Sequence, residues 1–214
     1  MTQQERNTEE RIFETAREIF TEKGFEGARM EEISQRAGIN KALLHYYYRT
    51  KEKLFNAIFE KVMGDFFREV LQMMASEAPL FTKVEFFVDR YITMVMKNPH
   101  IPNFIINELN RNPDRLISIF KNTPVIKESG FDKFATLVEK EIKLGNIEPI
   151  TPQDLLLNII ALSIFPIIAK PIIQGVIFKN DKKEYQMFLE RRKKEVARFV
   201  INAISKKNIE NKLQ

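Results

Sequence analysis

The segment from residue 36 to residue 51, RAGINKALLHYYYRTK, concentrates side chains that bind anions. It holds five basic side chains, His45 included, together with three adjacent tyrosines and no acidic residue. Lysine and arginine attract phosphate oxygens, and a tyrosine hydroxyl can donate a hydrogen bond to them. Residues 36–56 carry five lysines and arginines against one acidic residue, so the positive charge is local. The pattern predicts that this segment lies in a groove of DNA.

The net charge of the whole chain, +5, is a poorer guide than its distribution. Residues 1–35 hold nine acidic and five basic side chains, whereas residues 179–214 hold five acidic and eleven basic ones. A basic C-terminal stretch could attract an acidic partner, but a solvated terminal helix is the explanation that we favour. We therefore base the DNA prediction on residues 36–56 and not on the isoelectric point.

Helical signals surround the basic segment and must position it. The apolar residues of the first stretch recur at helical spacing, and they are Ile12, Phe13, Ala16, Ile19 and Phe20. Gly24 ends that helix, and a second helix is predicted over residues 30–37. Gly38 suits the left-handed residue that closes a helix. Asn40 and Thr50 can then cap a third short helix and a long fourth one.

Two short helices joined by a glycine turn predict a helix-turn-helix, whose second helix enters the major groove. Within residues 41–47, Leu44 shares the inward side with Ile39, and the other faces are left for DNA. Lys41 can reach phosphate or guanine, Ala42 can touch a thymine methyl, and His45 can donate to a base or a phosphate.

Three further side chains extend the predicted contact. Tyr46 and Tyr47 can bond phosphate oxygens, and Lys51 adds its charge to the N-terminal dipole of the next helix. The alternative from the residues alone is an ordinary helical hairpin with a basic face. In that case Tyr47 and Tyr48 pack against the first helix.

Residues 21–55, TEKGFEGARMEEISQRAGINKALLHYYYRTKEKLF, resemble the DNA-binding region of the tetracycline-repressor (TetR) family of bacterial transcription regulators. The matching positions are Lys23 to Phe25, Ile33, Ala37 to Lys41, Leu44, Tyr46 to Tyr48 and Lys51 to Leu54. The resemblance covers about the first quarter of the chain, and many positions agree in order and spacing. It implies an all-α fold, with a helix-turn-helix DNA-binding domain at residues 1–50 and an effector-binding and dimerisation domain at 51–214.

The chain departs from the family pattern at positions that bear on operator sequence. Ala28, Arg29 and Met30 stand where the family usually has a capping Thr or Ser, and Arg29 could replace the lost hydroxyl contact with a charged one. Leu43 stands at a common threonine, and His45 stands at the usual tyrosine. The expected DNA-binding residues are Arg29, Asn40, Lys41, Ala42, Leu43, His45, Tyr46, Tyr47 and Lys51.

The resemblance implies a homodimer that pairs through residues 151–177 and 183–206, and a pocket for a small hydrophobic or amphipathic effector. Each residue expected in the pocket could also be plain core or a helix cap. These candidates are Phe67, Phe87, Tyr91, Met94, Phe104, Asn107, Glu108, Phe134 and Asn158. A cationic effector would fit if Glu108 is buried. Thr82 with Glu85, Thr151 before Pro152, and Asp181 with Glu184 mark helix starts in this larger part.

The sequence argues against several other classes of protein. It has no cysteine, no phosphate-binding loop and only two histidines, at positions 45 and 100, so we expect neither an enzyme nor a metal or cofactor site. Residues 155–178 are long enough for a membrane span, but Lys170 and two prolines favour a buried helix. We expect a bacterial, cytoplasmic, nucleoid-associated regulator. The main alternative is a helical small-molecule-binding or adaptor protein that no longer uses DNA.

Overall fold

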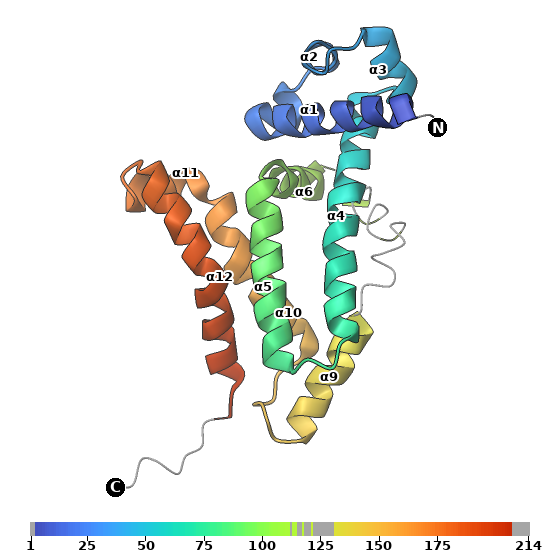
Figure 1. The fold of residues 1–214 in the computed structure, drawn as a ribbon. Helices are drawn as coiled ribbons and strands as arrows, with labels where there is room; N and C mark the ends of the chain where they lie inside the picture. Colours follow the sequence, from blue (N-terminus) through green and yellow to red (C-terminus); the bar gives the residue numbers. More distant parts are fainter. Residues whose placement is uncertain (1–2, 112, 115–116, 118–120, 122–130, 207–214) are drawn as a thin grey trace, which may run out of the picture. The chain divides into compact units, whose positions relative to one another are not determined.

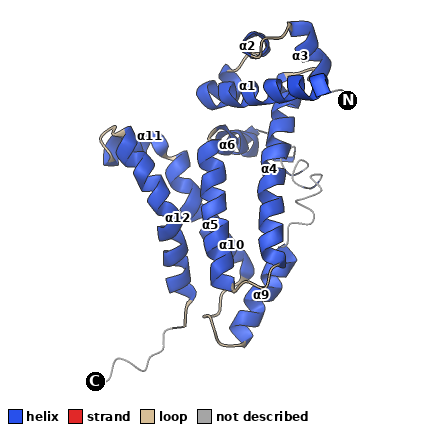
Figure 2. Cartoon of the chain, in the orientation of Figure 1, coloured by secondary structure: helices blue, strands red, loops and turns tan. Residues whose placement is uncertain are grey.

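The computed structural model describes residues 3–111, 113–114, 117, 121 and 131–206, and the helices in it confirm the predicted all-α class (Figures 1 and 2). Over these residues the pairing outside helices is one isolated bridge between Ile147 and Ser205. The helices are α1 (Gln3–Gly27), α2 (Met30–Arg36), α3 (Lys41–Tyr47), α4 (Lys51–Ala75), α5 (Leu80–Lys97), α6 (His100–Arg111), α9 (Phe131–Lys143), α10 (Pro152–Ile168), α11 (Lys170–Ile172), the π-helix η1 (Ile173–Ile177) and α12 (Lys182–Ile204).

Packing divides the chain into two compact units. The first unit comprises Met1–Asp65 and Lys97–Lys127, and the second comprises Phe66–Met96 and Glu128–Gln214. The first part of α4 and all of α6 therefore pack with α1, α2 and α3, whereas the expected domain division lay at residue 50. Helix α4 contributes to both units, because the boundary at Asp65 lies within it.

The core of the first unit is the apolar face predicted for the first helix. Ile12, Ala16, Ile19 and Phe20 are fully buried, and the Phe20 ring meets the Phe55 ring edge-on at 5.1 Å. Gly24 interrupts α1 with a left-handed φ of 69°, as expected of the residue that ends the regular helix. The chain turns there without strain because glycine has no Cβ.

The second unit is built around α5, α9, α10 and α12. Its core is formed by buried aliphatic side chains that all four helices contribute, among them Val88, Val138, Leu155 and Val196. A smaller cluster joins η1 to the start of α12 through Ile173, Tyr185 and Leu189. Each of these helices buries one face and exposes the other, as amphipathic helices in a globular unit do.

The long apolar stretch near residues 155–178 is not the single helix that we expected. It bends by 57° between Pro152–Ile168 and Lys170–Ile177, and it exposes large apolar side chains. Pro171, in the first turn of α11, can start a new helix but cannot continue α10. Among the described helices none alone could cross a membrane, although this bent pair has enough length and apolar residues.

Four predicted helix caps are confirmed, and one predicted helix start is wrong. The side chains of these caps each accept a hydrogen bond from the backbone N–H three residues later, and they are Asn40, Thr50, Thr151 and Asp181. Helix α5 begins at Leu80, so Thr82 lies inside its first turn and is not its cap. The ammonium of Lys83 instead occupies this corner, where it donates to the carbonyls of Met74 and Ser76 at 2.8 Å.

Candidate nucleic-acid interface

Helix α2 closes with a glycine turn that sets the direction of α3. The N–H of Gly38 donates to the carbonyl of Gln35, and the N–H of Ile39 donates to the carbonyl of Ser34. This pair of bonds, with Gly38 at a φ of 64°, is the Schellman arrangement that ends a helix. Asn40 then starts α3, because its Oδ1 accepts from the N–H of Leu43 at 2.7 Å. The helix-turn-helix geometry is thus fixed by backbone hydrogen bonds at the end of α2 and by a side-chain cap at the start of α3.

Helix α3 has one buried side and one exposed side, as the sequence predicted. Leu44 is fully buried, whereas Lys41 and Ala42 are exposed and 78% of Tyr46 is exposed. The first turn of α3 contains no acidic residue. The exposed side therefore offers a cation, a small side chain and a phenol to a ligand, with nothing on α3 that would repel an anion.

His45, Leu43 and Tyr47 are half-buried along the flank of α3. The Nδ1 of His45 lies 3.1 Å from the carbonyl oxygen of Arg49. A carbonyl oxygen only accepts, so Nδ1 must donate, and in the neutral ring Nε2 is then an acceptor. The neutral ring can therefore contact DNA only by accepting at Nε2 from a base N–H, because phosphate oxygens only accept. The donation to a base or a phosphate that the sequence predicted is not open to this form of His45. The Tyr47 ring packs edge-on against the ring of Tyr46 at 5.5 Å.

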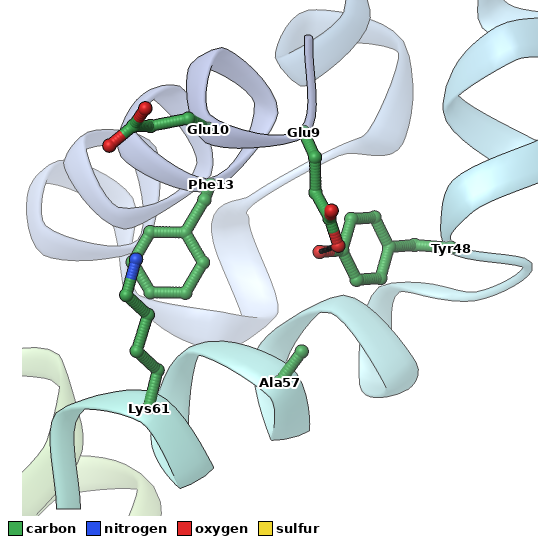
Figure 3. Close-up of a pocket in the computed structure, with 6 residues that line it drawn as sticks. All are labelled: Glu9, Glu10, Phe13, Tyr48, Ala57 and Lys61. Atoms are coloured by element: carbon green, nitrogen blue, oxygen red, sulfur yellow. Dashed lines mark hydrogen bonds between the residues drawn. The ribbon is translucent and has the colours of Figure 1, made fainter. Parts of the chain in front are cut away.

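Tyr48 ties the end of α3 to α1, which confirms part of the packing alternative. Its hydroxyl donates to Oε1 of Glu9 at 3.2 Å, and burial together with the nearby Glu9 carboxylate raises the pKa of Tyr48 to about 12. Figure 3 shows this pair at one side of a hollow of about 400 Å³. On the other side the Lys61 ammonium lies 4.4 Å from the centre of the Phe13 ring.

The ammonium of Lys51 is hydrogen-bonded to backbone carbonyls of the protein itself. Its Nζ donates to the carbonyls of Ala28 and Glu26, at 3.2 and 3.4 Å, and lies 4.6 Å from the centre of the Phe25 ring. These contacts hold the link between α1 and α2. The phosphate contact expected of Lys51 thus competes with an internal role that its position in the sequence gave no sign of.

Surface ion pairs also fasten α2 to α1. Glu32 accepts from Lys23 at 2.8 Å and from Arg36 at 2.9 Å, and Arg36 also pairs with Glu22. The hydrogen bond from Lys23 is the main cause that lowers the pKa of Glu32. Arg29, at the N-cap of α2, is exposed and forms no side-chain hydrogen bond as a cap.

The residues expected to line an effector pocket fall into three groups. Phe67, Phe87 and Tyr91 join an aromatic cluster with Phe66, in which ring centres lie 5.3 to 5.8 Å apart. Burial raises the pKa of Tyr91 to about 12.

The others are more dispersed. Met94 is half-buried, Phe134 belongs to the core of the second unit, and Asn107 and Asn158 are exposed. The side chains of Phe104 and Glu108 lie outside the described residues.

Sequence reasoning missed a contact between α6 and α1. His100, the first residue of α6, is only 3% exposed, and its Nδ1 lies 3.0 Å from Oγ1 of Thr21. Its ring also faces the rings of Phe20 and Phe55. The sequence showed only an isolated histidine after Asn98-Pro99, and nothing in its spacing links it to residue 21.

Comparison with known proteins supports this assignment of the helix-turn-helix. Residues 12–58 match the family model described as bacterial regulatory proteins, tetR family. The repressor NicS of Pseudomonas putida is 33% identical over 94 residues, which is 42% of this chain and 44% of NicS. The regulator RutR of Escherichia coli O157:H7 is 26% identical over 148 residues, covering 69% of this chain and 68% of RutR.

A solved structure extends the likeness to the whole fold. The regulator FadR of Bacillus subtilis, in complex with stearoyl-CoA, superposes with a TM-score of 0.61 at 15% identity. The match covers 91% of this chain and 98% of that one. The helices beyond the helix-turn-helix therefore follow the arrangement of that regulator, although the sequences have diverged widely.

Proposed function

The chain belongs to the TetR family of bacterial regulatory proteins, and from this membership we propose that it is a transcriptional repressor that binds a palindromic operator as a homodimer. The relatives are transcription regulators, which agrees with the prediction that the chain is not an enzyme. A protein that reads an operator works at the bacterial nucleoid, so the proposal carries a cytoplasmic location with it.

The exposed side of α3 is the observation that carries this proposal. A helix in the major groove needs side chains that meet base edges near its N-terminal turn, and Lys41 and Ala42 are exposed there. The buried Leu44 anchors the helix from behind. Tyr46 points away from the protein with most of its surface exposed, which suits a phosphate contact at the edge of the groove.

Exposed apolar side chains support dimerisation through the C-terminal helices. Leu157 and Phe165 on α10 lie two helical turns apart on one face and are 63% and 64% exposed. On α12, Phe199 is 64% exposed. Large apolar side chains grouped in this way usually mark a protein interface. A second copy seated on α10 and α12 would form a four-helix interface and bring two α3 helices to half-sites about 34 Å apart.

The second unit supplies the features expected of an effector site. The rings of Phe66, Phe67, Phe87 and Tyr91 form an apolar cluster with one phenol hydroxyl, in which most ring pairs meet edge-on or tilted. This composition favours a hydrophobic or amphipathic molecule. FadR, which has the same fold, holds stearoyl-CoA. We expect the effector to prefer a conformation in which the two α3 helices are wrongly spaced for the operator. The effector then lowers the affinity for the operator, and the operator lowers the affinity for the effector by the same factor.

Selection of bound sequences from a random DNA library, followed by mobility shifts at two salt concentrations, tests the proposal. We expect a palindromic sequence whose affinity falls steeply with salt, because each neutralised phosphate releases counterions. Lys41→Ala should weaken this binding, whereas Lys133→Ala, which removes an exposed lysine of α9, should leave it unchanged. Binding without sequence preference, or an effect of Lys133→Ala equal to that of Lys41→Ala, would favour the adaptor alternative.

A further inference from the structure

The hydroxyl hydrogen of Thr21 determines which atom donates in the hydrogen bond between α6 and α1. The hydroxyl of Thr21 donates its single proton to the carbonyl of Arg17 at 2.8 Å, because a carbonyl can only accept. The same Oγ1 lies 3.0 Å from Nδ1 of His100, so it must accept there and Nδ1 must carry the hydrogen. The bond network therefore selects the Nδ1–H form of a neutral imidazole, and Nε2 is left with its lone pair.

The surroundings of Nε2 oppose a second proton. This nitrogen is buried and has no hydrogen-bond partner among the described residues. The imidazole lies tilted beside the Phe20 ring, with the ring centres 6.4 Å apart, and meets the Phe55 ring edge-on at 5.9 Å. Arg17, on α1, is the charged side chain whose field reaches the ring, and it is positive. A proton on Nε2 would create a buried cation that no acceptor in the described part of the chain is bonded to stabilise.

We propose that His100 is a positioning residue that holds the first turn of α6 against α1 only while its imidazole is neutral, so that a proton on Nε2 detaches α6 from the first unit. The position of His100 gives this contact its importance. The chain leaves the second unit at Met96, and His100 lies four residues later, where α6 begins. The contact therefore fixes the point at which the chain returns to the helices that carry α3.

The direction of the pH dependence follows from the same geometry. Burial, and secondarily Arg17, lowers the pKa of His100 from 6.5 to about 4. Detached α6 would expose the imidazole and restore its ordinary pKa, so the detached state binds the proton more readily between these two values. Acid then favours detachment, by up to about tenfold in the equilibrium constant for each pH unit below the ordinary value.

Hydrogen exchange of the α6 amides in the full chain tests the proposal. We expect protection factors of α6 to fall as the pH drops from 6.5 toward 4, while those of α12 change much less. His100→Asn keeps an N–H donor for Thr21 but cannot take up a proton in this range, so it should remove most of the pH dependence. An identical pH profile for the two proteins would overturn the proposal.

A second measurement follows His100 itself, so the test does not depend on whether His100→Asn folds. The sequence has two histidines, so His45→Gln assigns both imidazole signals in a nitrogen NMR spectrum. At neutral pH we expect His100 in the Nδ1–H form, with a titration midpoint well below that of free histidine. An Nε2–H form, or an ordinary midpoint, would contradict the proposal independently of any substitution.

Discussion

At the scale of single residues, lysines of the first unit that occupy equivalent positions in their helices make different contacts. Lys41 is exposed on α3, whereas Lys51 donates to the carbonyls of Glu26 and Ala28 and covers the Phe25 ring. Both lysines stand in the first turn of a helix, so local sequence gives them the same expectation. Only the path of the chain through residues 24–29 brings acceptors to Lys51.

Replacement of Lys51 should therefore reduce the stability of the fold more directly than it reduces DNA binding. Lys51→Met keeps the alkyl chain over Phe25 but leaves two carbonyls without this donor, and we expect a loss of about 1 kcal/mol in the free energy of unfolding. Lys53→Met, an exposed neighbour on α4, is the matched control and should lose almost nothing. Urea unfolding measures both. Equal stabilities would show that the Lys51 contacts contribute little in solution.

Two tyrosines should make the folded protein sensitive to alkali. The pKa of Tyr48 and that of Tyr91 are raised from 10 to about 12, mainly by burial, so the folded state keeps protons that the unfolded state releases. This contribution to stability is fully present below pH 10 and is lost as the pH rises toward 12.

Tyr91→Phe should reduce the alkaline loss while leaving the stability near neutral pH almost unchanged. Its hydroxyl has no hydrogen-bond partner in the described part of the chain, so its removal should cost little. Unfolding curves on either side of pH 10 provide the comparison. If the variant loses stability with pH as steeply as the unmodified protein, Tyr91 does not remain buried and protonated in solution.

At the scale of helices, the most instructive element is α10, which contains Pro166 in its interior. Proline lacks the N–H that would donate to the carbonyl of Leu162 four residues earlier. Arg192 of α12 supplies the donor, with Nη2 at 2.7 Å from that carbonyl. The hydroxyl of Tyr185 donates to the carbonyl of Pro166 itself at 3.0 Å. Side chains of α12 thus donate hydrogen bonds to the carbonyls of Leu162 and Pro166, and these bonds fix the packing of the two helices.

This arrangement predicts a coupling between residues 166 and 192. Arg192→Met should destabilise the fold by about 1–3 kcal/mol, because it leaves the Leu162 carbonyl without a donor. In a Pro166→Ala background the same change should cost less, since the alanine N–H can donate instead. A double-mutant cycle by urea unfolding measures the difference. Additive effects of the two substitutions would rule out this explanation of Arg192.

Much of the helical structure could be predicted from the sequence. The apolar spacing in α1, the glycine that closes α2 and the caps Asn40 and Asp181 are local signals, and local hydrogen bonds follow from them. The partners of Arg192 and His100 could not be predicted, because each pairs residues far apart in the sequence, for example Thr21 and His100. The bend after α10 and the start of α5 were missed although nearby residues, Pro171 and Lys83, mark them.

At the scale of the whole molecule, the proposal joins a DNA-reading unit to a unit that pairs with a second copy. The exposed side of α3 was predicted from residue types, because Leu44 and the polar positions separate at helical spacing. The pocket was less predictable, because phenylalanine serves equally as lining and as core. Asn158 illustrates the difficulty, since it interrupts an apolar stretch yet is exposed on α10 beside Leu157.

Pairing of two chains should depend on the exposed face of α10. Phe165→Arg places a charge in the proposed interface, and we expect sedimentation equilibrium to show a shift toward monomers. Operator affinity should fall with it, since each half-site would then be bound alone. Leu144→Arg, at a similarly exposed position after α9, is the control and should remain dimeric. A Phe165→Arg protein that is still a dimer would place the interface elsewhere.

The placement of α3 in DNA can be measured directly, because the chain has no cysteine of its own. Ala42→Cys creates a unique thiol on the exposed side of α3, and an iron–EDTA group attached to it cuts nearby DNA. We predict two clusters of cuts in the selected operator, about one helical turn apart. Diffuse cutting, no stronger than that from Lys133→Cys, would contradict the claim that this helix enters the groove.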